Sequence, residues 1–260
     1  MDPATLIGVV LAFGALYGMM TIEGVNVTSI LLPAPMVLVF FATIAVGIAS
    51  NTVPDAIRAF KAIPRAFTGK LKKPAVVIDQ MVGIAEVARR DGLLALEQEA
   101  EKIDDPFLSM ALQNMADGTD AEDLRTLLED EITTRDTAAR TSGKFFMTLG
   151  GYAPTIGIIG TVVSLTHVLE NLSSPAELGP SIAAAFVATL WGLLSANFIW
   201  LPIGTRLIRL CDLEEQRMTL QMEGVLAVQA GSQPRVLGER LRALVPAHTL
   251  PKPEKLPKAA

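Results

Sequence analysis

The chain has 260 residues, 50% of them hydrophobic, and a mean hydropathy of +0.42, which is high for a water-soluble protein of this length. Its net charge is −5 and the sequence shows no nucleic-acid-binding motif, so we expect no nucleic-acid partner. The single cysteine, Cys211, excludes a disulfide framework within the chain. The composition therefore indicates a membrane protein that binds no nucleic acid.

Two long uncharged stretches open the chain, separated by a single acidic residue. A helix needs roughly 20 apolar residues to cross a hydrocarbon core of about 30 Å. We therefore predict a transmembrane hairpin over residues 1–54, with helices near 4–20 and 30–50. Pro33 and Pro35 predict that the second helix becomes regular only after them, because the residue before a proline disfavours helical backbone.

The middle of the chain, residues 55–144, reads as a cytoplasmic helical domain. A basic amphipathic stretch at 55–73 predicts an interfacial helix whose cations lie near anionic lipid headgroups. Apolar residues then recur three and four apart from 74 to 132, and no stretch shows the alternation of a strand. We expect breaks between helices at three places: Asp91-Gly92, residues 104–106 and Asp117-Gly118.

A second hairpin, residues 145–205, contains two further charge-free stretches joined by a short acidic link. Its helices carry many small residues and hydroxyls, which in lipid belong where helices meet or where water enters. We predict that this hairpin lines a pore and that a cytoplasmic helical extension, 206–230, follows it. The Pro-rich basic tail, 231–260, is expected to be disordered. The predicted fold class is thus an all-α polytopic membrane protein with four transmembrane helices in two hairpins.

Lys and Arg are confined to one side of the predicted spans. None occurs before Arg58 or in the outer links near 21–29 and 170–180, whereas they are common at the other ends of the helices. Positively charged residues flank membrane helices on the cytoplasmic side. We therefore predict that both termini and the middle domain lie in the cytoplasm.

The interiors of the predicted spans contain no Asp, Glu, Lys or Arg. A membrane protein that moves a proton or a cation usually keeps an ionisable group at depth. If this chain conducts ions, a partner must therefore supply the carboxylate. The sequence also lacks a metal-ligand spacing and a nucleophile motif, so we expect no enzyme activity, no metal site and no cofactor.

Three stretches, GYAPTIGIIGTV, LGPSIAAAFVATLWG and ARRDGLLALE, resemble the MotA/PomA subunit of the bacterial flagellar stator, and the likeness extends from residue 1 to about 210. The resemblance implies a homopentamer in the bacterial inner membrane around a dimer of a MotB/PomB-type subunit. That partner carries an ion-accepting Asp in its span and is anchored to peptidoglycan. The implied function is to convert a flow of Na⁺ or H⁺ into torque on the rotor, with the transported ion as the only small ligand.

The same resemblance assigns roles within the second hairpin. Pro154 and Pro202 match the family prolines that couple ion binding to movement, and Thr161 and Thr189 match threonines of the ion path in sodium-driven relatives. Because a hydroxyl oxygen suits a partly dehydrated Na⁺ better than a methyl group does, Thr161 inclines the expectation toward sodium. Taken alone, such threonines more often bond their own backbone, and such prolines are ordinary kinks.

Arg89, Arg90 and Glu97 match the charged residues that contact the rotor protein FliG, although a charge run on a helix is usually a solvated face. Two other functions compete with the stator. An ExbB/TolQ-like energiser of envelope transport would show the same hairpin, but such chains usually have three spans instead of four. A membrane scaffold without conduction would not need paired prolines and aligned hydroxyls in one hairpin.

Overall fold

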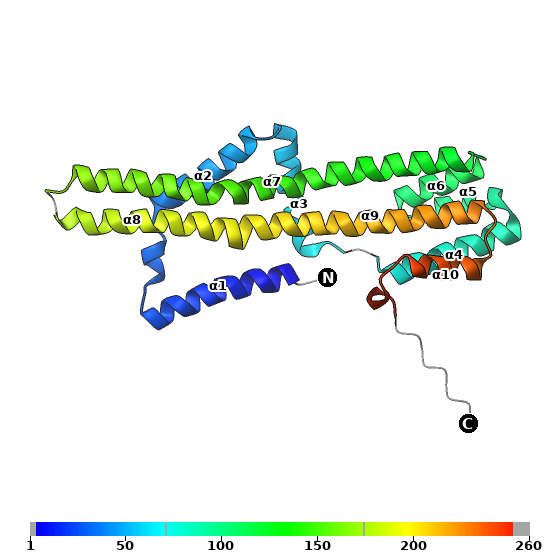
Figure 1. The fold of residues 1–260 in the computed structure, drawn as a ribbon, viewed down its shortest axis with the longest axis horizontal. Helices are drawn as coiled ribbons and strands as arrows, with labels where there is room; N and C mark the ends of the chain where they lie inside the picture. The colour runs from blue at the N-terminus through cyan, green and yellow to red at the C-terminus, as the bar shows by residue number, and fades with distance from the viewer. Residues whose placement is uncertain (1–3, 71, 174, 252–260) are drawn as a thin grey trace, which may run out of the picture. The chain divides into compact units, whose positions relative to one another are not determined.

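The structure is a computed structural model that describes residues 4–70, 72–173 and 175–251 (Figure 1). Within these ranges every regular element is a helix or a helical turn, which confirms the predicted all-α class. The chain divides into two compact units, one of Met1–Lys70 with Ala138–Cys211 and the other of Leu71–Thr137 with Asp212–Ala260. Two long helices contribute residues to both units.

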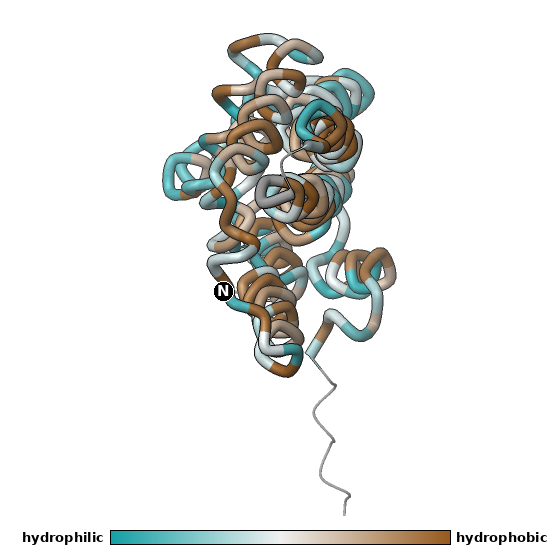
Figure 2. Tube along the Cα trace, turned by 90° about the vertical axis from the view of Figure 1, so that its left-hand side faces the viewer, coloured by the Kyte–Doolittle hydropathy of each residue, from teal (hydrophilic) through white to brown (hydrophobic). Residues whose placement is uncertain are grey.

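The first unit begins with α1 (Ala4–Glu23), a 3-10 turn at Val27–Ile30 and α2 (Pro33–Ala49). In Figure 2, α1 is drawn in brown and pale shades along most of its length, as expected for a helix in contact with lipid. The prediction that α2 becomes regular only after its prolines is wrong. The helix starts at Pro33, because the amide groups of a first helical turn have no acceptor within the helix and proline loses nothing there.

The second hairpin is built from helices longer than a membrane span. α7 (Ala121–Glu170) runs unbroken for 50 residues, which confirms that the third predicted membrane helix is continuous with the charged helical stretch before it. Its partner consists of α8 (Pro175–Leu194), a π-helical segment at Ser195–Trp200 and α9 (Leu201–Gln229). The fourth predicted span therefore also continues as expected, with one unexpected π segment.

Three of the described helical stretches are long and apolar enough to cross a membrane by length and composition: Ala4–Glu23, Ala121–Glu170 and Leu178–Gln229. The apolar α2 has 17 residues, which is at the lower end of the usual range of about 17–25. The four predicted spans thus correspond to four apolar helical stretches, the second of them short.

α3 (Val53–Thr68) follows α2 after three residues and ends earlier than the predicted basic stretch. Thr52 caps it, since the Thr52 hydroxyl accepts a hydrogen bond from the Asp55 amide at 3.3 Å. On the inner side, the ring of Phe60 lies edge-on to Phe145 and Phe146, with centroids 5.5 and 5.8 Å away. These aromatic contacts fix α3 against α7 in the core of the first unit.

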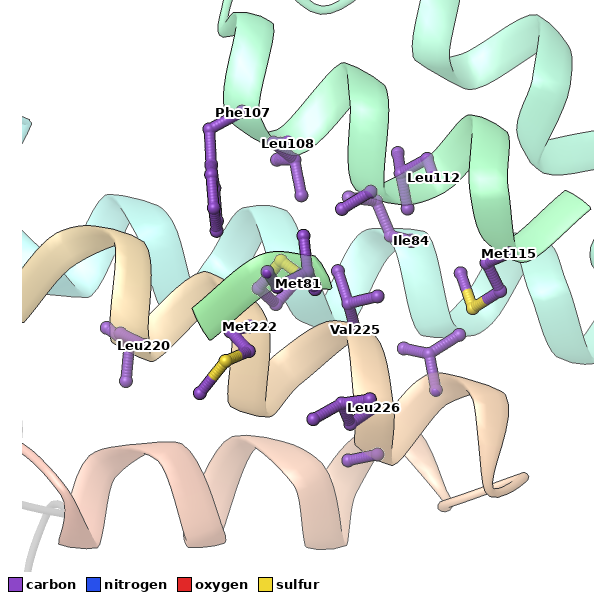
Figure 3. Close-up of a cluster of buried hydrophobic side chains, with 14 of the residues drawn as sticks. Met81, Ile84, Phe107, Leu108, Leu112, Met115, Leu220, Met222, Val225 and Leu226 are labelled. Carbon is purple, nitrogen blue, oxygen red and sulfur yellow. The ribbon is translucent and has the colours of Figure 1, made fainter. Parts of the chain in front are cut away.

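The second unit contains α4 (Pro74–Asp91), a short turn at Leu93–Ala95, α5 (Leu96–Glu101) and α6 (Pro106–Ala116), packed with the first turns of α7 and the last turns of α9. All three predicted breaks occur, two of them at glycines with left-handed backbone, Gly92 (φ +85°) and Gly118 (φ +81°). Figure 3 shows the core, in which side chains of α4, α6 and α9 interdigitate: Met81, Ile84, Phe107, Leu108, Leu112, Met115, Leu220, Met222, Val225 and Leu226.

The predicted disordered tail is wrong for its first part. Residues 234–243 form α10 (Pro234–Ala243), which begins with a proline and buries Leu237 and Leu241 in the core of the second unit. The half-buried carboxylate of Glu223 on α9 also pairs with Arg240, at 2.9 Å. Two leucines four apart bury enough surface to hold a short helix against α4, a signal that the Pro-rich composition masked. Residues 252–260 lie outside the described residues.

A buried ion pair joins α9 to the start of α6. Asp105 accepts hydrogen bonds from the Phe107 amide at 3.2 Å and from Gln221 Nε2 at 2.8 Å, and it pairs with Arg217. Burial by itself raises the pKa of Asp105, but the hydrogen bonds from Gln221 and Arg217 outweigh it and hold the pKa below its ordinary value. The charged form of Asp105 therefore stabilises the folded second unit.

We expect Asp105→Asn to lower the free energy of unfolding by about 2 kcal/mol at neutral pH, since it removes charge-assisted hydrogen bonds from a buried site. The folded-state pKa is depressed, so the stabilisation is complete above the unfolded-state pKa of about 3.9 and is lost as the pH falls through the folded value. The gap between variant and wild type should therefore close in acid. Thermal unfolding of the detergent-solubilised protein measures it, with the exposed Asp104→Asn as control. An equal loss in both variants would contradict the role of the buried pair.

Candidate functional site

The candidate ion path lies at a close approach of α7 and α8. A side chain on Gly157 would place its Cβ 2.8 Å from the backbone oxygen of Ala188, and one on Gly192 would come 2.8 Å from the oxygen of Ala153. Backbones can approach this closely only where small residues face each other, as between helices in membranes. The predicted small-residue contact within the hairpin is therefore present.

Directly beside this crossing, the structure brings Thr161 of α7 and Thr189 of α8 together. Their hydroxyl oxygens lie 2.5 Å apart, and both side chains are half-buried. The Thr161 oxygen also lies 2.9 Å from the carbonyl oxygen of Ala185 and 3.1 Å from that of Gly157. Because Thr161 has a single hydroxyl proton, it can donate to only one of these acceptors at a time.

The chemical capacity of this cluster is limited and specific. Two hydroxyls and two carbonyls offer oxygen lone pairs that could replace part of the hydration shell of a small cation. None of these groups takes up or releases a proton near neutral pH. The cluster can therefore line a path for an ion but cannot serve as its proton-accepting group.

Pro154 is half-buried inside α7, and α7 continues through it. The missing amide leaves the carbonyl of Gly150, four residues earlier, without its usual donor. Gly150 is packed against the Leu201 side chain, because a Cβ at Gly150 would lie 2.4 Å from Leu201 Cδ2. The break caused by Pro154 thus faces the residue that precedes Pro202 on the other arm of the hairpin.

Pro202 sits at the second position of α9, immediately after the π-helical segment Ser195–Trp200. Here the Leu201 amide donates to the carbonyl of Ala196, five residues back instead of four. Pro202 cannot supply the amide that an α-helix would direct to the Phe198 carbonyl, so the wider π turn accommodates this gap in the ladder. Sequence reasoning foresaw a proline kink here and missed the π turn, for which Pro202 is the only signal.

The three predicted rotor-contact residues share one part of the second unit, at the end of α4 and the start of α5. Arg89, Arg90 and Glu97 are all exposed. Arg90 forms a two-pronged ion pair with Asp91, with Nε–Oδ1 at 3.0 Å and Nη2–Oδ2 at 2.8 Å. The hydrogen bond from Arg90 holds the pKa of Asp91 below its ordinary value. Arg89 and Glu97 form no ion pair with any residue in the described ranges.

The apolar repeat predicted between residues 74 and 132 does not stay on one face near this surface. Leu94 is 76% exposed, whereas Leu96 is fully buried. The cause is the break at Gly92, after which a short turn at Leu93–Ala95 shifts the helical phase. An exposed apolar side chain therefore stands between Arg90 and Glu97.

Two further polar side chains of the hairpin, His167 and Trp191, join it to neighbouring segments. His167 is exposed and its Nδ1 lies 3.3 Å from the hydroxyl of Ser181, so it joins the two arms near the link. Trp191 donates to the carbonyl of Ile30 at 2.6 Å and packs in the core. Among the described residues, no group of three His, Cys, Asp or Glu could hold a metal ion. That the protein needs no cofactor stays a prediction.

Comparison with known proteins identifies the family. Residues 99–220 match the MotA/TolQ/ExbB proton channel family. The chain is 35% identical over 253 residues to Motility protein A of Bacillus subtilis (strain 168), which covers 95% of this chain and 92% of the relative. The chain belongs to the MotA/TolQ/ExbB proton channel family. Within it, the chain is of the MotA/PomA stator type, since it is also 34% identical over 247 residues to chemotaxis protein PomA of Vibrio alginolyticus, covering 93% and 94% of the two chains.

Solved structures agree with this assignment. The chain aligns with the C. jejuni MotAB structure at a TM-score of 0.91 and 25% identity, over 97% of this chain and 100% of that one. It aligns with the flagellar MotAB stator complex from Bacillus subtilis at a TM-score of 0.86 and 33% identity, over 94% and 96%. The family is one of membrane channels and is not a known enzyme family. With its apolar helices and its stator relatives, the chain is a multi-pass inner-membrane protein of the flagellar stator.

Proposed function

We propose that this flagellar stator subunit forms a cation channel together with a MotB/PomB-type partner and converts the flow of ions into torque on the rotor. The observation that carries the proposal is the match of nearly the whole chain to MotAB structures, combined with a hairpin that has no ionisable group at depth. Residues 145–169 and 178–205 contain no Asp, Glu, Lys or Arg. The carboxylate that accepts the ion must therefore come from the partner.

One chain leaves an apolar face of α7 uncovered, which supports an assembly. Five large apolar side chains of its membrane part are more than half exposed: Ile158, Ile159, Val162, Val163 and Leu169. The first four lie within three residues of Thr161 along the helix, so a partner that covers them would lie close to the hydroxyl pair. A homopentamer around a dimer of the partner, as the family resemblance implies, accounts for this face.

The Lys and Arg residues that flank the spans support termini in the cytoplasm. Labelling of Ser29→Cys with a reagent added from the outer side would check this orientation.

Within this channel, Thr161 and Thr189 line the ion path, and Pro154 and Pro202 couple ion binding to movement. Support comes from the 2.5 Å hydroxyl pair and from the two backbone breaks that meet at Gly150 and Leu201. Each arm of the hairpin lacks a backbone hydrogen bond at this level, so each helix needs less free energy to bend there than an uninterrupted helix would. A charge change at the hydroxyl pair can therefore move the cytoplasmic part of the hairpin.

The surface of Arg89, Arg90 and Glu97 contacts FliG in this proposal. It is exposed, carries both signs of charge, and includes the apolar side chain of Leu94. An ExbB/TolQ-like energiser is the alternative function. It is not favoured, because the solved structures that match are MotAB stators and the chain has four apolar helical stretches.

The direct test is to purify the complex from its native membrane and to identify by mass spectrometry what comes with it. We expect a companion with one membrane span, an Asp within that span and a peptidoglycan-binding domain. A small companion of the ExbD/TolR kind would instead move the function to envelope energisation and remove the rotor from the account.

The rotor contact predicts that Arg90→Glu combined with Glu97→Lys reduces torque while the complex still assembles, since the surface charges are reversed without a change of fold. Swimming speed and co-purification of the partner are the two readouts. Reversal of Lys102 and Glu99, an exposed ion pair at 2.8 Å on the same part of the unit, is the matched control and should swim normally. Normal swimming of the Arg90/Glu97 variant would refute the contact.

We propose Na⁺ as the transported ion, because two hydroxyls and two carbonyls converge at Thr161. Swimming speed at a fixed proton gradient should rise with sodium concentration in the wild type, and Thr161→Ala should need more sodium for the same speed. Thr166→Ala is the control, since the Thr166 hydroxyl only bonds the Val162 carbonyl of its own helix. A speed that does not respond to sodium in the wild type would rule the ion out in favour of H⁺.

A further inference from the structure

α3 lies at the depth where the membrane part of α7 begins. Its Phe60 ring contacts Phe145 and Phe146, the first two residues after Lys144 and hence the first of a charge-free stretch. The residue after α3, Gly69, is packed against the Leu210 side chain, just beyond Arg209. Both contacts fall where apolar span gives way to charged helix. α3 therefore sits at the boundary between hydrocarbon and water.

The direction of α3 suits that boundary. In Figure 1, α3 runs across α7 instead of along it, so a membrane crossed by α7 has α3 near its plane. α3 also starts only three residues after the end of α2, which leaves no room for the chain to move away from the surface. Such a helix must meet lipid headgroups with any side that the protein leaves uncovered.

The uncovered side of α3 has two adjoining sectors. The inner side buries Ala56, Ala59 and Ala66. On the outer side, Val53 is 60% exposed and Ile57 is 50% exposed, and next to them around the helix come the exposed cations Lys61 and Arg65. An apolar strip bordered by cations matches the transition from acyl chain to headgroup phosphate.

The cations of α3 differ in whether they already form an ion pair within the chain. Arg58 pairs with Asp55 at 3.1 Å, which in turn accepts a hydrogen bond from Thr52. Lys61 and Arg65 form no ion pair with any residue that the structure describes. Their positive charges are therefore available to an anion from outside the chain.

We propose that the exposed face of α3 is a binding surface for anionic phospholipid, with Lys61 and Arg65 on the headgroup phosphate and with Val53 and Ile57 against the acyl chains. A bound lipid links α3 to the membrane surface and, through the Phe60 contacts, holds the point at which α7 leaves the bilayer. Free phosphate lacks the acyl chains that the apolar strip requires, so the surface is specific for lipid.

The test uses the full complex in detergent and adds either phosphatidylglycerol or the neutral phosphatidylcholine. A ligand that binds only the folded state raises the melting temperature. Phosphatidylglycerol should raise it more than phosphatidylcholine does, and inorganic phosphate should not reproduce the rise. In Lys61→Gln with Arg65→Gln, the phosphatidylglycerol concentration for half the rise should increase roughly twenty-five-fold, at about fivefold for each cation. Lys102→Gln with Arg235→Gln, exposed cations of the other unit, should behave as the wild type.

Three outcomes would overturn the proposal: an equal rise with both lipids, an equal rise with inorganic phosphate, or an unchanged phosphatidylglycerol response in the Lys61/Arg65 variant. If a second copy of the chain covers α3 in the assembly, the two lipids will raise the melting temperature equally. The proposal rests on the membrane location of this stator subunit but not on its contact with the rotor. Because the readout is lipid-dependent melting and not swimming, its failure is distinct from a failure of the proposed motor function.

Discussion

The close approach of α7 to the α8–α9 arm is the constraint on which the membrane part depends. Gly143, Gly150 and Gly157 recur every seven residues on α7, and a Cβ on any of them would come within 2.8 Å of an atom of the facing arm. A seven-residue repeat keeps one face of a helix against a neighbour over several turns. This stripe of small residues brings the backbones together, and the distance between the hydroxyls of Thr161 and Thr189 follows from it.

The same stripe explains why both backbone breaks lie at one level. Gly150 contacts Leu201 and is also the residue whose carbonyl Pro154 leaves without a donor. On the facing arm, Pro202 and the π turn interrupt the ladder beside it. Farther from the link between the arms, Gly143 packs against Ile208, and nearer to the link Gly157 packs against Ala188. The arms are closely packed at Gly150 and Leu201 too, but each arm has an interrupted backbone hydrogen-bond ladder there, so bending of the arms costs least at this level.

Much of this arrangement could be predicted from the sequence, because hydropathy and charge report what lipid permits. The apolar stretches, the helix breaks at Gly92 and Gly118 and the continuation of α7 all follow from local signals. What failed was decided by packing: α10 forms because Leu237 and Leu241 find a partner in the second unit. The pairing of Thr161 with Thr189 is a contact between residues 28 apart, which no local pattern specifies.

The missing carboxylate of the hairpin is consistent with its packing. A charged group at depth must be paired or hydrated, and the helix crossing at Gly157 and Gly192 leaves no room for either. In the proposed channel the acid belongs to a separate subunit, so the two arms can stay closely packed at the level of the hydroxyl pair.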